Sequence, residues 1–292
     1  MFGKIAVTDI NKLMVKTFLM KKINKGYASS TVTHMKNTIS GVLNLAIEDE
    51  LMSVNPAHKI GKIFKAQKMG ALMDPLNREE LTILLKTIQT HFHRHYPMVL
   101  TLDRTGMRLG EVLGLQWGDI DFNSRFITIQ RGLSKGKVGT PKNGKIRKVD
   151  MSLQLTEALK VLKHQRKIET LRKGWSRAPE WVFVNENGNY IHDKHWRAHI
   201  FYKALEKAKL RKIRIHDLRH TYASLLIQAG ESLAYIRDQL GHHSIKVTVD
   251  IYGHMAPEGN KAAVDRLDDI NSNATFRTPS APENEKANQS NG

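Results

Sequence analysis

Apolar residues recur at spacings of three and four along most of this chain, and this periodicity is that of one face of an α-helix. In the first 60 residues it predicts two amphipathic helices separated by Lys25-Gly26, and Asn55-Pro56 ends the pattern. Residues 61–75 contain three lysines and two glycines without a clear period, as is typical of a linker between domains. The sequence therefore predicts a helical domain at residues 1–60, a linker at 61–75 and a second domain beyond it.

The second domain, expected at residues 76–264, mixes helical and strand-like patterns. It starts at Asn77, where Glu80 three positions later can complete a capping box. Segments rich in β-branched or aromatic residues predict strands at Phe126–Gln130, Ile146–Met151 and Trp181–Val184, and Asn143-Gly144 predicts a hairpin between the first two. Helical periodicity returns at 155–171, 196–210 and 217–228, and in a short apolar segment before Gly241. We therefore expect a mainly α fold with a small antiparallel β-sheet.

The charge of the chain indicates a polyanionic partner. Its 292 residues include 46 Lys and Arg against 28 Asp and Glu, a formal net charge of +18 that favours nucleic acid first and an anionic membrane second. Residues 1–70 hold eleven lysines and no arginine, and lysine suits sequence-independent contact with phosphate. By contrast, residues 265–292 are rich in Asn, Ser, Pro and Glu, with five acids against three bases, which predicts a disordered tail that avoids nucleic acid.

Several classes of protein are excluded or made less favourable by composition. The chain has no cysteine, so disulfides, thiolate zinc sites and cysteine nucleophiles are excluded. No stretch has the apolar length of a membrane span, and the first residues lack the apolar segment of a secretory signal. We therefore expect a cytoplasmic protein without a membrane partner.

Four separated motifs carry residues whose chemistry suits a phosphodiester. TGMRLGE contains Arg108 just inside an expected helix, with Glu111 close enough to orient the guanidinium. Lys142 lies in TPKNGK, within a run of seven basic and no acidic residues. HDLRHTYAS contains His216 and Arg219 on one helix face, and LGHHSIKVTVDIYGH contains His242 and, ten residues later, Tyr252. Each motif alone also fits a simpler interpretation: a surface ion pair, a phosphate-contacting patch, an ordinary helix start or a core tyrosine.

Two other kinds of site fit the sequence less well. Residues 139–145 have the glycine and lysine spacing of a phosphate-binding loop, but Ile146 stands where that loop needs Ser or Thr, and a strand follows instead of a helix. His216 and His220 lie four residues apart, as do His195 and His199, which is a spacing that metal ligands use. Neither pair has the glutamate of a metalloprotease helix or a marked third ligand, so we expect no metal site.

Taken together and in this order, the four motifs resemble those of the tyrosine recombinase (phage integrase) family over roughly residues 5–260. The resemblance implies a helical core-binding domain of SAM-like type and a mixed catalytic domain that form a C-shaped clamp around duplex DNA. It implies Tyr252 as the nucleophile, Arg108 and Arg219 on the scissile phosphate, Lys142 as the hairpin lysine and Glu111 as support for the first arginine. It also implies His216 and His242 as the two catalytic histidines, with His243 leaving the last assignment ambiguous by one residue.

Elementary chemistry agrees with these implied roles. Two guanidiniums stabilise the negative charge that builds up on nonbridging phosphate oxygens during attack. A tyrosine phenol, with a pKa of about 10, must give up its proton as it attacks, and His216 or His242 can accept it. Lys142 can protonate the departing 5′ oxygen. Because the arginines supply the positive charge and the phosphotyrosine conserves the bond energy, we expect no cofactor, neither metal nor ATP.

The expected function is that of a site-specific recombinase that integrates or excises a mobile element. The expected partners are duplex DNA, further copies of the chain in a homotetramer on paired sites, and an excisionase or a DNA-bending protein of a bacterial or phage-infected cell, at its nucleoid. Outside the catalytic set, we expect lysines to contact DNA at Lys21, Lys22, Lys36, Lys62, Lys65, Lys135, Lys137 and Lys145. A non-catalytic DNA-binding regulator and a type IB topoisomerase stay open as alternatives.

The N-terminus departs from the family pattern. Many phage integrases carry an arm-site domain before the core-binding domain, and this chain begins too late to contain one. The first core-binding helix is itself open to being incomplete. An expression fragment, a shortened element-borne homologue and a relative of the chromosome-dimer-resolving recombinases all fit this beginning.

Overall fold

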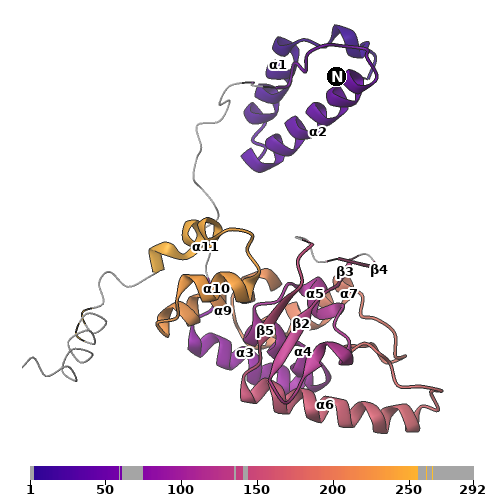
Figure 1. Ribbon diagram of the computed structural model, residues 1–292, viewed down its shortest axis with the longest axis vertical. Helices are drawn as coiled ribbons and strands as arrows, with labels where there is room; N and C mark the ends of the chain where they lie inside the picture. Colours follow the sequence, from indigo (N-terminus) through magenta and orange to yellow (C-terminus); the bar gives the residue numbers. More distant parts are fainter. Residues whose placement is uncertain are drawn as a thin grey trace, which may run out of the picture. The chain divides into compact units, whose positions relative to one another are not determined.

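The computed structural model describes residues 3–58, 60, 75–134, 136–140, 144–255, 261 and 265 (Figure 1). The chain forms two compact units, Met1–Leu72 and Met73–Gly292. The predicted linker at 61–75 and tail at 265–292 lie, except for Pro75 and Asp265, outside the described residues. No helix of the described part is long and apolar enough to cross a membrane.

The first unit is built on two helices, α1 (Lys12–Asn24) and α2 (Ser29–Glu48), as the periodicity predicted. Asn11 caps α1 by accepting a hydrogen bond from the Met14 backbone. The core between the helices is formed by Val15, Leu19, Val32, Leu43, Ala57 and Ile60. A short helical turn at Val7–Asp9 precedes α1.

Asn55 fixes the segment that follows α2. Its side-chain amide donates to the Ser40 carbonyl (3.0 Å) and to Asn44 Oδ1 (2.5 Å), and its Oδ1 accepts from the Ala57 backbone (2.8 Å). The side chain is buried, so these bonds replace water that cannot reach it. Asn55-Pro56 therefore ends the helical pattern and also attaches the following segment to α2.

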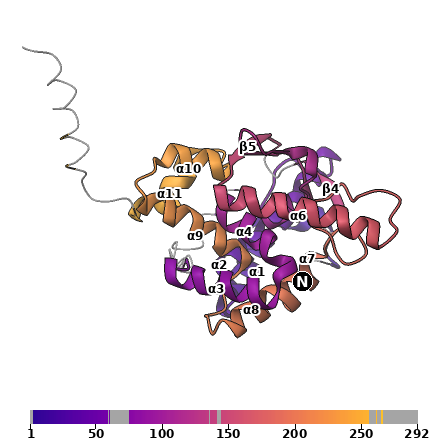
Figure 2. The ribbon, with the colours of Figure 1, turned by 90° about the horizontal axis from the view of Figure 1, so that it is seen from below.

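The second unit is mainly helical. Its helices are α3 (Arg78–His91), α4 (Tyr96–Thr105), α5 (Leu109–Leu113), α6 (Leu153–Arg172), α7 (Asp193–Trp196), α8 (Tyr202–Lys207), α9 (Ile215–Gln228), α10 (Leu233–Leu240) and α11 (Ile245–Tyr252). The expected capping box of Asn77 and Glu80 starts α3. Helix α4 packs against α3, α5, α6 and α9 and is buried over most of its length. Helices α9, α10 and α11 gather at one end of this unit (Figure 2).

Two small antiparallel sheets accompany the helices. The first has the order β1 (Ile120–Asp121), β2 (Phe126–Ile129), β5 (Arg147–Asp150), with Ile127 opposite Val149. The second pairs β3 (Gly132–Ser134) with β4 (Lys137–Gly139). The expected antiparallel pair of β2 and β5 is present. It is not a simple hairpin, because the segment of chain that connects the two strands forms the β3–β4 ribbon.

The strand predicted at Trp181–Val184 was wrong. Trp181 and Val184 form only isolated bridges, to Gln116 and Tyr190. Val182, Phe183 and Val184 are all buried, so consecutive side chains enter the core instead of alternating between two faces. The segment is apolar because it is buried in the core, although its backbone is irregular.

The single helix predicted at 196–210 is also different in the structure. A π-helical turn at Arg197–Phe201 separates α7 from α8. Trp196 and Phe201, five residues apart, are both buried and stack at 6.1 Å between ring centroids. The wider turn lets both large rings point into the core, which the regular 3.6-residue period cannot do. Helix α11, which carries Tyr252, was not predicted as a helix.

We expect Asn55→Ala to destabilise the first unit, because it leaves the buried Ala57 amide without its acceptor and removes the side-chain bonds to Ser40 and Asn44. The cost should be about 1–3 kcal/mol. Hydrogen exchange of the α2 backbone amides in the full chain measures it. Asn37→Ala, at an exposed position of the same helix, is the matched control and should leave exchange unchanged or slower. Equal exchange in both variants would contradict the role of Asn55.

Candidate active site

Arg108 is positioned by the tight turn between α4 and α5. Gly106 ends α4 in the left-handed region (φ 60°), and a Cβ atom there would lie 2.5 Å from Cδ1 of Tyr222. A side chain at position 106 is therefore excluded both by conformation and by space. Arg108 follows as the N-cap of α5, not just inside the helix as the sequence suggested.

Glu111 is shared by two arginines. Its Oε1 accepts from Nη1 of Arg108 (3.0 Å), and its two oxygens accept from Nη1 and Nη2 of Arg147 (3.0 and 2.7 Å). Burial alone would raise the pKa of the Glu111 carboxyl, but the hydrogen bonds and charges of Arg147 and Arg108 outweigh it and lower that pKa. The sequence pointed to the pair of Arg108 and Glu111. It gave Arg147 only as one base of the run.

Arg219 is a buried residue of α9. Its Nη1 donates to the Gly106 carbonyl (2.7 Å), and its Nη2 donates to the Leu240 carbonyl. These acceptors are the C-terminal ends of α4 and α10, whose partial negative charge suits a cation. Burial, together with the nearby charges of Arg108 and Arg147, lowers the pKa of the Arg219 guanidinium. Because its charged form is disfavoured by its surroundings, Arg219 is stabilised by an anion that binds beside it.

Tyr252 is the last residue of α11, and its side chain is only 1% exposed. Its hydroxyl lies 2.6 Å from Nδ1 of His220 on α9. Burial raises the pKa of the Tyr252 phenol to about 12, with the charge of Arg219 acting in the opposite direction. The sequence named His216 and His242 for this tyrosine, whereas the hydrogen bond is made by His220. The four-residue spacing of His216 and His220 puts both on one helix face, but that spacing alone is equally typical of a metal-ligand pair.

His216 and His242 lie near the same groups. The ring of His216 meets that of His220 edge-on at 5.1 Å between centroids. His242 follows Gly241, whose left-handed conformation (φ 66°) ends α10, and its Nδ1 pairs with Thr248 Oγ1 at 2.9 Å. Burial first, and then neighbouring positive charges, lower the pKa of each ring to about 4. Both are therefore neutral at pH 7.

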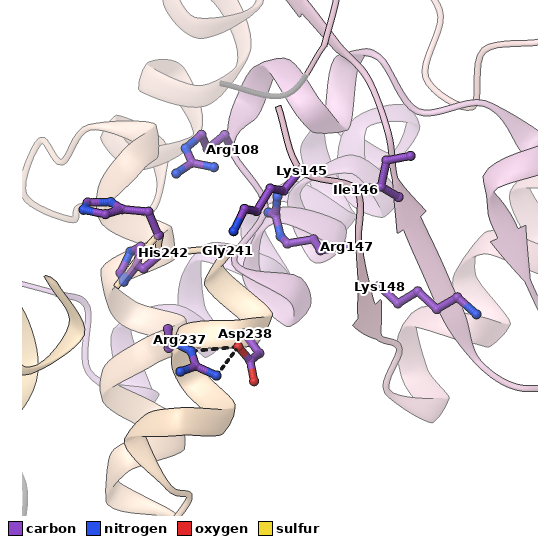
Figure 3. Close-up of a pocket in the computed structure, with 10 residues that line it drawn as sticks. Arg108, Lys145, Ile146, Arg147, Lys148, Arg237, Asp238, Gly241 and His242 are labelled. Carbon is purple, nitrogen blue, oxygen red and sulfur yellow. Dashed lines mark hydrogen bonds and ion pairs between the residues drawn. The ribbon is translucent and has the colours of Figure 1, made fainter. Parts of the chain in front are cut away.

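A basic pocket of about 490 Å³ opens in front of Arg108 (Figure 3). It is lined by Arg108, Lys145, Ile146, Arg147, Lys148, Arg237, Asp238, Gly241, His242 and His243. Five of these side chains are Lys or Arg, and the single acid, Asp238, is paired with Arg237. In Figure 3, Arg108 lies above His242 and Lys145 lies above Gly241, with the charged end of Lys145 directed toward the His242 side. Such a lining suits an anionic group of phosphate size or larger.

Only some of the other predicted site residues belong to the part of the chain that the structure describes. Lys142, Lys135, Lys62 and Lys65 lie outside the described residues. Lys21 and Lys22 are on α1, Lys36 is on α2, and Lys137 is exposed on β4. Lys22 lies over the rings of Phe18 and Tyr27, within 5.4 Å of each centroid. Among the described residues, no three His, Asp or Glu side chains gather as metal ligands would.

Comparison with known proteins decides the family. The pattern of the phage integrase family matches residues 74–258, which is most of the second unit. The chain belongs to the phage integrase family. It is therefore a tyrosine recombinase, an enzyme that cleaves and rejoins DNA strands at specific sites in mobile genetic elements.

Individual relatives extend this likeness over both units. The ICEBs1 integrase of Bacillus subtilis (strain 168) is 29% identical over 281 residues, covering 90% of this chain and 70% of the relative. The transposase from transposon Tn916 of Enterococcus faecalis is 24% identical over 283 residues, covering 91% and 68%. A solved structure of the Tn1549 transposon integrase with transposon right end DNA has a TM-score of 0.71 at 21% identity, covering 91% of this chain and 88% of that one. The structural likeness shows that the fold is shared.

We expect Glu111→Gln to cost about 3 kcal/mol or more near pH 7, because it leaves two arginines without their buried counter-charge. The folded-state pKa of Glu111 is lowered, so its stabilisation is present above the unfolded value of about 4.3 and is lost as pH falls through the folded value. The difference in unfolding free energy between wild type and variant should therefore shrink below about pH 4.

Urea unfolding across pH 3–7 measures this difference. Glu157→Gln is the matched control, because its ion pair with Lys160 is exposed and should contribute less than about 1 kcal/mol. A pH-independent cost at position 111 would show that the carboxylate charge is not what stabilises the site.

Proposed function

We propose that Tyr252 attacks a phosphodiester of duplex DNA and forms a 3′-phosphotyrosyl intermediate, by which the enzyme integrates or excises a mobile element. The observation that carries this proposal is the basic pocket, which joins Arg108 and His242 beside the helix that holds Arg219. The side chain of Tyr252 bonds to that same helix. Because Tyr252 is buried, the site has to open for the phosphate to reach its oxygen.

The arginines supply the charge that the transition state needs. Arg108 is a quarter exposed and lies at the pocket, where its free guanidinium edge can contact a nonbridging oxygen. Arg219 is held by two carbonyls, so its remaining N–H groups are fixed in direction. Two guanidiniums placed before the reaction stabilise the pentavalent phosphorus more than the ground state.

Proton transfer completes the reaction. Lys142 is the donor to the departing 5′ oxygen, as the family resemblance implies, and Lys145 contacts a backbone phosphate from the pocket wall. His216 and His242 contribute neutral imidazoles that hydrogen-bond to the phosphate. The phosphotyrosine conserves the energy of the broken bond, so the 5′ hydroxyl can reverse the step without ATP.

The rest of the chain supports binding and assembly. Residues 1–60 act as the core-binding domain and residues 76–264 as the catalytic domain of a clamp around DNA, with the lysines of α1 and α2 on the backbone. Exchange between two duplexes uses four copies of the chain on paired sites. An excisionase or a DNA-bending protein of the bacterial nucleoid sets the direction of the reaction.

The nucleophile can be tested by trapping. A target duplex is first selected from randomised oligonucleotides by covalent capture on the wild-type protein, and is then nicked so that the cleaved end diffuses away. Wild type should accumulate an adduct at Tyr252, and Tyr252→Phe should form none while its DNA affinity stays within a few-fold. Tyr202→Phe, on α8, is the control and should react like wild type. Mapping the adduct to Tyr222 or Tyr235 would refute the assignment.

The proton donor can be tested with sulfur at the bridging 5′ position of the same duplex. An alkoxide, with a pKa on the order of 15, needs a proton to leave, whereas a thiolate near ~8.5 does not. Lys142→Ala should be badly slowed on ordinary DNA and largely restored on the sulfur substrate. Lys145→Ala should show a mild, salt-sensitive defect on both. Sulfur rescue of Lys145→Ala alone would move the donor to the pocket lysine.

A further inference from the structure

Among the described residues, His220 is the histidine that contacts the Tyr252 hydroxyl. The 2.6 Å contact joins Nδ1 of His220 to the phenol oxygen, while Nδ1 of His242 is paired with Thr248. His216 meets the edge of the His220 ring. The group that faces the reacting oxygen is therefore the residue next to Arg219, not either histidine of the implied catalytic set.

The contact has a defined direction. The Tyr252 phenol keeps its proton, since burial raises its pKa to about 12, and burial with the charges of Arg214 and Arg219 lowers the pKa of His220. A neutral imidazole has two tautomers, and the one protonated on Nε2 presents a lone pair on Nδ1. In that tautomer Tyr252 donates and His220 accepts. The acceptor end of this bond is the atom that a general base would use.

His220 is a buried residue with a nearby counter-charge. It lies in the middle of α9, where its carbonyl accepts from Ser224 Oγ at 2.9 Å. The groups facing its ring are His216, Asp217, Arg214 and Arg219 from α9 and its N-cap, His242 from the turn after α10, and Tyr252 from α11. Asp217 alone among them acts to raise the pKa of His220, so its carboxylate stabilises an imidazolium when one forms.

We propose that His220 is the general base of the cleavage step, which rests on Tyr252 being the nucleophile as proposed above. As the Tyr252 oxygen bonds to phosphorus, its proton moves to Nδ1 of His220. The bond from phosphorus to the 5′ oxygen breaks, and that oxygen takes a proton from the lysine donor. In rejoining, the 5′ hydroxyl gives its proton back to the lysine as it attacks phosphorus, Tyr252 leaves, and the proton on His220 returns to the phenol. Each turnover therefore restores the neutral histidine.

The transfer is tied to bond formation by the two pKa values. A phenol with a pKa of about 12 does not ionise against a histidine whose pKa is lowered, so the proton stays on Tyr252 in the resting site. The phenol becomes acidic only as its oxygen bonds to phosphorus, which is when a positioned base lowers the barrier. The same hydrogen bond therefore keeps the nucleophile unreactive before DNA binds and activates it during attack.

The test is single-turnover cleavage of the captured, nicked duplex by His220→Ala and His220→Gln across pH 6–10. Glutamine keeps the bulk and a hydrogen-bond acceptor but takes no proton, so it controls for folding. Both variants should cleave about 10²-fold or more slowly near pH 7 while binding DNA within a few-fold of wild type. His164→Ala, at an exposed position of α6, should match wild type.

The pH profile separates the role of a base from that of support. Wild type should be nearly independent of pH above 7, whereas both variants should gain close to tenfold per pH unit, because solvent hydroxide must then take the proton. A wild-type rate and profile in His220→Gln would overturn the proposal, as would faster cleavage in His220→Ala, which would make the contact an inhibitory latch. If wild type captures no DNA, or forms its adduct elsewhere than Tyr252, the function proposed above fails and the role of His220 fails with it. A defect confined to the role of His220 would instead leave the wild-type adduct at Tyr252 and appear only in the His220 variants.

Discussion

The buried carboxylate of Glu111 is the interaction on which the arrangement of the site depends. It holds Arg108 on its own helix and, through two hydrogen bonds, Arg147 on β5. Arg147 in turn donates from Nε to the Gln239 carbonyl on α10 and packs against Gly241, where a Cβ would lie 2.7 Å from its Cδ. One acid therefore links three elements that are far apart in sequence. Removing it would leave two cations without their buried counter-charge at the wall of the basic pocket.

Arg219 extends this connection to the remaining helices. Its two carbonyl bonds join the ends of α4 and α10, and the next residue, His220, reaches α11 through Tyr252. The two helix ends that Arg219 joins are capped by Gly106 and Gly241, both in the left-handed conformation. Arg219 and the histidine that contacts Tyr252 are thus neighbours on one turn of α9. A movement of α11 that shifts Tyr252 has to work against this turn.

How much the sequence could predict depended on how local each signal was. The helices of the first unit, the capping box at Asn77 and the pairing of Arg108 with Glu111 follow from spacings within one helix turn, and they are present. Arg147 could not be singled out within a run of seven bases, because its partner is 36 residues away. The buried segment Val182–Val184 resembled a strand, since apolar content alone does not distinguish a strand from an irregular core segment. The contact of His220 with Tyr252 could not be predicted, because it depends on the packing of α11 against α9, 32 residues apart in sequence.

The histidines and arginines of the site impose opposite requirements on each other. Arg108 and Arg219 lower the pKa of both His216 and His242, in addition to the effect of burial, so the site holds neutral imidazoles beside concentrated positive charge. A phosphodiester bound among the arginines cancels part of that charge and therefore raises the pKa of every nearby histidine. The rings become better bases at the moment when the substrate is in place, and poorer ones when it is absent. If His220 is the base as proposed, this positive charge disfavours proton abstraction from Tyr252 until a phosphodiester is bound.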